Sequence, residues 1–459
     1  MTKNFILFST LALLGVMTVD FATIFLAAII YFSGIALLFF VNKKDKTTKQ
    51  IIRIYQIVFS AGFAYICICY LFMTSHGYEY LLAWDIHNYF MPNTIDFLAH
   101  GSITSAMAEN WSGFNLFSRY HSGYFGYLIP FAYLSEFLGA NLYVSMQFTT
   151  LLIASLSAVV VFKLLLVNQF KPKKAYKYAI IICLFSVLFF YSTQLLRDIH
   201  IMFLYLLGIY LTFEKNFSLG HLFKLLIVIL LSCTLRIETG LFQFILVPVY
   251  LLLTMQQSKK KVAAVSMSAV IAVGGLFLLA TYSNQVVSIL TNNSEIYLES
   301  DKGSGVIGTL HNIPVAGNVL SVIYNAVQPL PFWAKYKASA GDYRPEMYNI
   351  MTFPLSFASL FNWITLFYIS AYIFNGKIRR KVSENISKPL LYQLYIGFIF
   401  LYIQSAVISQ RRLMAYYVIF YILFYVVFTT VTKKSREHLM IGAISSYSVL
   451  HLFALFYKI

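Results

Sequence analysis

The sequence predicts an all-α polytopic membrane protein, and three observations lead to this fold class. Hydrophobic residues make up 59% of the 459 residues, whereas charged residues make up 11%, far fewer than in soluble domains. Apolar runs of roughly 15–25 residues recur along the chain, as helices that cross about 30 Å of hydrocarbon require. Most of the lysines lie in the short loops on one side of these runs, as insertion topology demands.

About 13 transmembrane helices reconcile the hydropathy with loop charges that alternate along the chain. We expect one integral-membrane domain over residues 1–459, with a cytoplasmic amino terminus. The predicted spans lie near residues 5–19, 21–41, 54–75, 141–167, 178–196, 199–213, 222–236, 240–254, 262–280, 350–374, 389–409, 413–431 and 439–457.

Residues 125–139 are also apolar enough to cross, but a crossing there would reverse every later loop. It would place the lysine cluster at 171–177 outside, against the positive-inside rule. We therefore interpret this segment as an interfacial or partly buried helix. It belongs to the first of two long extracytoplasmic loops, which cover residues 76–140 and 281–349. We expect the first of these loops to contain amphipathic or interfacial helices.

The composition excludes several classes of function. The net charge of +17 comes from lysines scattered over short loops, so we expect membrane lipids and no nucleic acid as partner. The cytoplasmic loops leave no room for a nucleotide-binding domain, and neither a phosphate loop nor a dinucleotide fingerprint is present. All four cysteines fall within apolar runs, so we expect neither a disulfide framework nor a zinc site.

Arginine is distributed differently from lysine. We assign 24 of the 34 basic residues to the cytoplasmic side, and 20 of these are lysines. The opposite side holds four lysines and six arginines. Topology does not require these arginines, and charge near a span end is costly, so they are the best indication of function. They are Arg119, Arg197, Arg236, Arg344, Arg411 and Arg412.

Three predicted turns on that side each offer a guanidinium group at membrane depth. The turns hold Arg197 with Asp198, Arg236 with Glu238, and Arg411 with Arg412. Arginine presents a planar fork of donors that matches two phosphate oxygens, which predicts an anion site. The alternative is that the first two arginines pair with the acid in their own turn, while the last two extend to the interface.

In the first long loop, Asp85 follows Trp84 about ten residues after a span, and His87 is two residues further on. A carboxylate at the membrane boundary can accept a proton from an attacking hydroxyl group. The alternative is that Asp85 N-caps a surface helix. Arg119 and His121 form a further basic patch in the same loop.

These features resemble the GT-C superfamily of integral-membrane glycosyltransferases, and in particular the Wzy- or EpsG-type polymerases of bacterial surface polysaccharides. The resemblance is carried by the first-loop motif Trp84-Asp85-Ile-His-Asn-Tyr-Phe and by residues 124–141, 195–200, 235–238 and 411–417. It implies a hexosyl transfer from a polyprenyl-phosphate- or diphosphate-linked saccharide donor to a glycan acceptor. It also implies an active site on the extracytoplasmic face of a bacterial plasma (inner) membrane.

In this scheme Asp85 is the catalytic residue, and the other candidates bind phosphate or substrate. These are His87, Arg119, His121, Arg197, Asp198, Arg236, Glu238, Arg411 and Arg412. The family's second acidic residue is absent, because His87 stands near Asp85 instead. We therefore assign neither a cofactor nor a metal site, and a divalent cation stays an open alternative.

Two other functions stay open. A transporter or flippase of lipid-linked saccharides would need polar groups in the middle of spans, for which Lys163, Gln243 and Gln404 are the candidates. A non-catalytic scaffold would leave the arginine bias without a cause. The sequence does not distinguish a polymerase from an enzyme that transfers one sugar.

Overall fold

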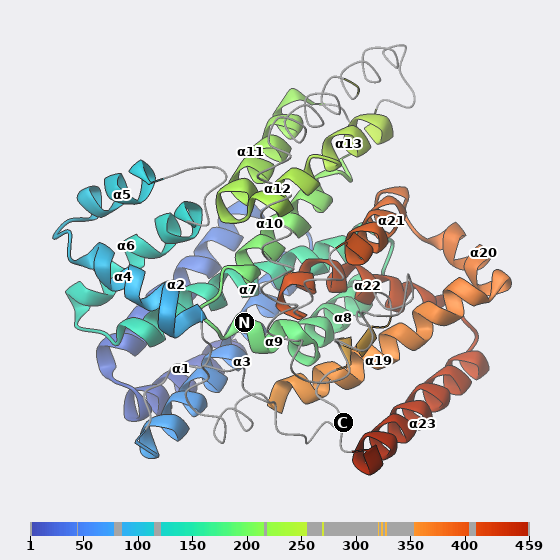
Figure 1. Ribbon diagram of the computed structural model, residues 1–459, viewed down its shortest axis with the longest axis horizontal. Coiled ribbons are helices and arrows are strands. Elements are labelled where there is room, and N and C mark those ends of the chain that lie inside the picture. Colours follow the sequence, from blue (N-terminus) through green and yellow to red (C-terminus); the bar gives the residue numbers. More distant parts are fainter. Residues whose placement is uncertain are drawn as a thin grey trace. The chain divides into compact units, whose positions relative to one another are not determined.

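The structure is a computed structural model, and every regular element that it describes is a helix (Figure 1). The description covers residues 2–43, 45–77, 85–113, 121–214, 218–254, 269, 320, 323–324, 326–327, 353–403 and 410–457. The first half holds α1 (Thr2–Thr18), α2 (Phe21–Val41), α3 (Thr48–Ser75), η1 (Ile86–Phe90), α4 (Met91–Leu98), α5 (Ile103–Ser112), α6 (Ser122–Leu138), α7 (Leu142–Val167), α8 (Pro172–Phe185), α9 (Val187–Ser192), α10 (Asp198–Leu211) and α11 (Leu219–Leu235). The second half holds α12 (Ile237–Gln243), α13 (Leu246–Thr254), α19 (Phe353–Phe374), α20 (Gly376–Asn385), α21 (Lys388–Ile403), α22 (Gln410–Thr430) and α23 (Lys433–Tyr457).

Five helices in the described ranges are long and apolar enough to cross a membrane. They are α2, α3, α7, α19 and the part of α22 from Leu413 to Thr430. Shorter apolar helices lie at Phe5–Thr18, Asp198–Leu211, Leu219–Leu235 and Thr239–Thr254. The chain is thus a helical membrane protein, as the sequence predicts, although its helices match the thirteen predicted spans in part. The span predicted at 262–280 lies outside the described residues.

Two of the predicted spans are interrupted. Between α8 and α9, Ser186 has an extended backbone (φ −108°, ψ 178°), and its hydroxyl accepts a hydrogen bond from the Leu188 N–H at 3.3 Å. Between α12 and α13, the chain leaves helical geometry four residues before Pro248. Proline has no N–H to donate to the carbonyl four residues earlier, and its ring clashes with that carbonyl in a regular helix. Hydropathy alone does not reveal such breaks.

Contacts at both ends show that α2 and α7 run parallel. At one end, the Asn141 N–H donates to Thr23 Oγ1 at 2.7 Å. At the other, Lys163 Nζ donates to Asn42 Oδ1 at 2.5 Å. The helical rise separates these anchors by roughly 30 Å, which matches the hydrocarbon thickness of a bilayer. A crossing by residues 125–139 would have made α2 and α7 antiparallel, so the arrangement is the one expected if that segment does not cross.

The segment 125–139 lies within α6, which forms a hairpin with α7. The Tyr127 hydroxyl donates to the Thr149 carbonyl at 2.9 Å, so the start of α6 lies about two turns along α7. The hairpin is closed by Gly139, whose φ of +66° is left-handed and strained for residues with a Cβ atom. One face of α6 is buried through Phe125, while Phe137 is 85% exposed.

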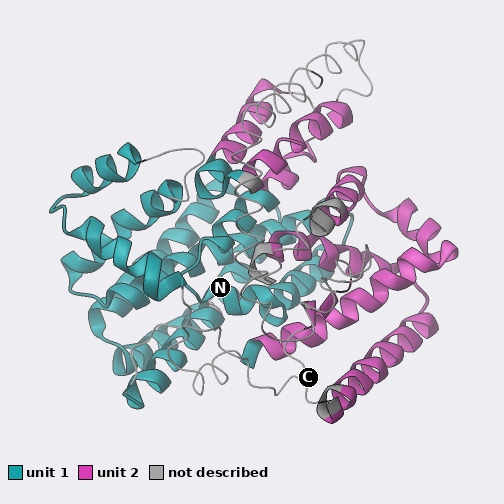
Figure 2. Cartoon of the chain, in the orientation of Figure 1, with its two compact units in different colours: residues 1–206, 231–237, 336–354 teal, residues 207–230, 238–335, 355–459 magenta. Residues whose placement is uncertain are grey.

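The chain divides into two compact units, coloured separately in Figure 2. Unit 1 comprises residues 1–206, 231–237 and 336–354, and unit 2 comprises residues 207–230, 238–335 and 355–459. Stacked aromatic rings contribute to the core of unit 1. The ring centroids of Phe8 and Tyr31 lie 3.8 Å apart, and those of Phe63 and Phe148 lie 5.2 Å apart. In unit 2, the buried residues Ala326 and Val327, from the predicted second loop, bond to α19 through their carbonyl groups.

Candidate functional site

Two turns of unit 1 each place an arginine beside the end of a helix. Arg197 directly precedes α10, and its carbonyl accepts from the N–H of His200 at 2.9 Å. Arg236 directly follows α11 and donates its N–H to the Ser232 carbonyl at 2.8 Å. The Gln147 side chain of α7 donates to the Thr193 carbonyl at 2.6 Å, which fixes the turn that leads to Arg197.

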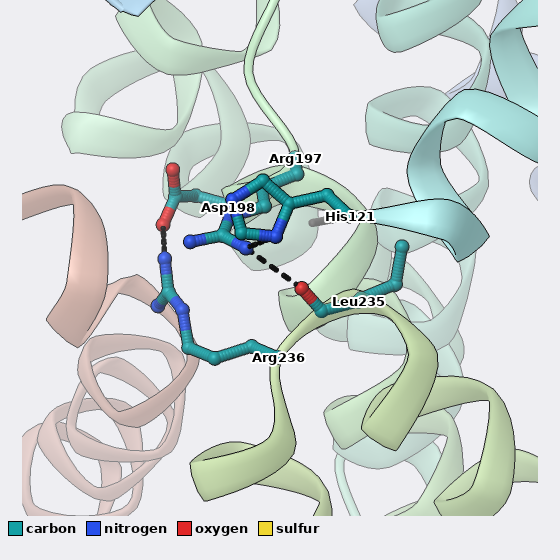
Figure 3. Close-up of polar contacts among 5 residues, drawn as sticks. All are labelled: His121, Arg197, Asp198, Leu235 and Arg236. Atoms are coloured by element: carbon teal, nitrogen blue, oxygen red, sulfur yellow. Dashed lines mark hydrogen bonds and ion pairs between the residues drawn. The ribbon is translucent and has the colours of Figure 1, made fainter. Parts of the chain in front are cut away.

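An ion pair joins the two turns. Arg236 Nη2 lies 2.6 Å from Asp198 Oδ1, and the two side chains are 13% and 4% exposed (Figure 3). Arg236 therefore reaches across to the acid of the other turn. Asp198 also begins α10, where the helix dipole favours a negative charge.

The partners of Arg197 include two neutral acceptors. Its Nη1 donates to the Leu235 carbonyl at 2.9 Å and also to Nδ1 of His121 (Figure 3). His121 directly precedes α6. The adjacent Gly123 allows this end of α6 to approach Thr234 closely, since a Cβ atom there would lie 2.1 Å from Thr234 Oγ1. The cluster thus draws on α6, α10 and α11.

The imidazole of His121 is neutral. Burial lowers the pKa of His121 to about 2, and the charges of Arg197 and Arg236 act in the same direction, while Asp198 opposes them. Because Nδ1 accepts from Arg197, the proton of the neutral ring lies on Nε2, which is then a donor.

The charges of this cluster do not cancel. Arg197 and Arg236 contribute two positive charges, Asp198 contributes one negative charge, and His121 is neutral. The four side chains therefore carry one net positive charge in a partly buried position among apolar helices. Guanidinium groups in such a position are suited to binding an oxyanion.

The segment that follows Asp85 contacts the same cluster. The ring centroid of Tyr89 lies 5.6 Å from that of His121, and the ring centroid of Phe90 lies 5.0 Å from that of Tyr124. Asp85 itself has helical backbone angles (φ −60°, ψ −32°), and its side chain makes no capping hydrogen bond. The alternative that Asp85 N-caps a surface helix is therefore wrong. Asp85 and His87 are both half-buried.

Other predicted site residues are not brought into this cluster by the described contacts. Arg119 lies outside the described residues, as does Arg344. Glu238 belongs to α12, and Arg411 and Arg412 belong to the first turn of α22 in unit 2. The side chains of these three residues are outside the described set, so their roles stay predictions.

The structure adds neighbours that the sequence did not single out. His200 is 6% exposed and lies between two tyrosines, with ring centroids 5.1 Å from Tyr124 and 4.7 Å from Tyr127. The two tyrosines are three residues apart and so lie on one helix face. This spacing could have suggested that they share a neighbour. The Leu235 carbonyl that holds Arg197 could not be predicted, because a backbone acceptor has no signature in the sequence.

Among the residues that the structure describes, no group of three or more His, Cys, Asp or Glu side chains could hold a metal ion. No protein-family model, curated protein or solved structure matches this chain. The resemblance to the GT-C superfamily consequently stays a prediction, and the functional argument depends on the geometry of the cluster.

Proposed function

We propose that this chain is a membrane glycosyltransferase or polysaccharide polymerase of bacterial cell-surface glycan synthesis. Its donor is a sugar linked to a polyprenyl phosphate or diphosphate, and it acts on the extracytoplasmic face of the plasma membrane. The observation that carries the proposal is the cluster of Arg197, Arg236, Asp198 and His121, with its net positive charge.

The chemistry assigns a role to each group. The bond between the sugar's anomeric carbon and the phosphate oxygen breaks, and the phosphate leaves with the bonding electrons. Arg197 and Arg236 stabilise the negative charge that develops on it. The acceptor hydroxyl oxygen forms the new bond to the anomeric carbon, and its proton passes to the carboxylate of Asp85.

The length of α10 supports an anion that arrives in the membrane. α10 has 14 residues and rises about 21 Å, less than the roughly 30 Å of a hydrocarbon layer. If its far end reaches the lysine-rich boundary, then Arg197 and Asp198 at its start lie below the opposite boundary. A phosphate carried on a lipid reaches that depth more readily than a soluble one.

Transport of a lipid-linked saccharide is the second candidate, and one observation favours it. Gln243 is fully buried, and neither polar atom of its side-chain amide has a hydrogen-bond partner in the described part of the chain. The other described candidate, Lys163, bonds to Asn42 at the end of α2 and so lies near the end of a span. Gln404 is outside the described residues.

The test is an assay of the purified protein in lipid vesicles with a fluorescent polyprenyl-diphosphate-linked sugar and a glycan acceptor. We expect sugar transfer by the wild type, and a loss of about 10²–10⁴-fold in the rate for Asp85→Asn while the lipid still binds. Arg380→Gln, at an exposed residue of α20, is the matched control and should keep the wild-type rate. Movement of the lipid across the membrane with its sugar linkage intact would support transport instead.

A further inference from the structure

Tyr89 lies against the charged cluster, although the function proposed above gives it no role. Its half-buried ring is 5.6 Å from that of His121 at an interplanar angle of 73°, and 6.0 Å from that of Phe125. No hydrogen bond within the described residues engages its hydroxyl group. The ring is thus fixed by packing, and the contacts of the described residues give its hydroxyl group no role.

The electrostatic setting keeps this hydroxyl group protonated. Burial raises the pKa of Tyr89 above its ordinary value, and the positive charge of Arg197 offsets part of that effect. At neutral pH the tyrosine is therefore a hydrogen-bond donor, and its ring contacts His121, to which the Arg197 guanidinium donates. Two donors beside the same histidine complement an oxyanion, which can accept from both.

The turn that carries Tyr89 also carries the predicted base. η1 is a π-helical turn, in which the Met91 N–H donates to the Ile86 carbonyl. A π turn contains slightly more than four residues, so Asp85 and Tyr89 fall on the same face, one turn apart. The acid and the phenol therefore face the same side of this segment, and Tyr89 contacts the cluster there.

We propose that Tyr89 is a further binding residue of the anion site, with its hydroxyl group donating to an oxygen of the lipid phosphate held by Arg197. The inference depends on the proposed function for the identity of the anion. It adds a donor from the first long loop to the guanidinium groups of the two turns, and it places the Asp85 segment next to the leaving group.

The experiment measures binding of farnesyl phosphate to the full chain in detergent, with farnesol and inorganic phosphate as comparison ligands. Tyr89→Phe removes the donor and keeps the ring packing, so we expect farnesyl phosphate affinity to fall about tenfold. Farnesol binding should not change. Tyr133→Phe is the matched control, because the Tyr133 hydroxyl donates to the Phe97 carbonyl at 3.0 Å, and its affinity should equal that of the wild type.

Arg197→Gln separates this inference from the proposed function. If Arg197→Gln weakens binding while Tyr89→Phe binds like the wild type, the role of Tyr89 is overturned and the anion site stands. If Arg197→Gln has no effect, or if inorganic phosphate binds as tightly as farnesyl phosphate, the lipid-phosphate site itself is wrong. Should Tyr89→Phe fold poorly, 3-fluorotyrosine at position 89, a stronger donor of the same shape, must tighten binding for the inference to hold.

Discussion

The two units each bury polar side chains, but the two sets differ in charge. In unit 2, the Tyr421 hydroxyl donates to Asn362 Oδ1 at 2.5 Å, and Asn362 Nδ2 donates to the Ala326 carbonyl at 2.7 Å. Ser359 and Tyr447, 2.9 Å apart, extend this network. Every one of these groups is neutral. In unit 1, by contrast, two guanidinium groups share the cluster with a single carboxylate.

The difference separates a neutral network that holds the fold from a charged cluster to which the proposed function assigns a ligand. The unit 2 network matches donors to acceptors between helices, which stabilises packing without any further molecule. The unit 1 cluster keeps a positive charge that its four members do not cancel. Buried polarity alone is therefore a poor indication of function, and the proposed function depends on the net charge of the four side chains instead. The following variants test this contrast.

Asp198→Ala should give the largest effect. Without the carboxylate, Arg197 and Arg236 would form a partly buried pair of like charges, at a cost of about 3–5 kcal/mol in the free energy of unfolding. Unfolding in denaturant, followed by circular dichroism, measures the loss. Glu384→Gln, which removes the exposed partner of Arg380, is the control and should change stability by less than about 1 kcal/mol. Equal stability of the two variants would contradict the contrast between the units.

Asn362→Ala should break the neutral network without touching the anion site. It leaves the Ala326 carbonyl and the Tyr421 hydroxyl without the partners they have now, which costs about 1–3 kcal/mol. We expect reduced thermal stability but an unchanged affinity for farnesyl phosphate. A variant that keeps its stability and loses affinity would show that unit 2 takes part in binding.

The sequence predicts the class of fold well, because apolar length and lysine placement are strong physical constraints on a membrane chain. It also identifies all four side chains of the cluster as candidates. Arg197, Asp198 and Arg236 come from the turns that carry the arginine excess, and His121 comes from the basic patch of the first long loop. It does not predict how they pair, since the pairing joins turns 38 residues apart through tertiary packing. The helix break before Pro248 lies within an apolar run that hydropathy predicts as a single span.

His121 gives a pH effect whose sign follows from its environment. Its pKa in the folded state is about 2, well below its ordinary value of 6.5, so the unfolded chain takes up a proton between these values that the folded chain does not. The stabilisation is thus present above pH 6.5 and is lost as the pH falls, by about 1.4 kcal/mol per pH unit. Unfolding at pH 7 and pH 5 should show a smaller pH dependence for His121→Gln than for the wild type. An identical pH dependence would mean that His121 takes up its proton in the folded chain as readily as in the unfolded chain.

The smallest effect concerns the hairpin that presents His121. Gly139 has a φ of +66°, and no atom lies within 4 Å of the position a Cβ would take, so Gly139→Ala introduces backbone strain without a clash. We expect a loss of about 1 kcal/mol in stability. Gly376→Ala in α20 is the matched change, with equal space and no positive φ, and it should be neutral or slightly stabilising. Because Gly139 joins α6 to α7, its strain should also weaken farnesyl phosphate binding slightly, whereas Gly376→Ala should leave it unchanged. Equal effects of the two substitutions on binding would show that the hairpin does not position His121.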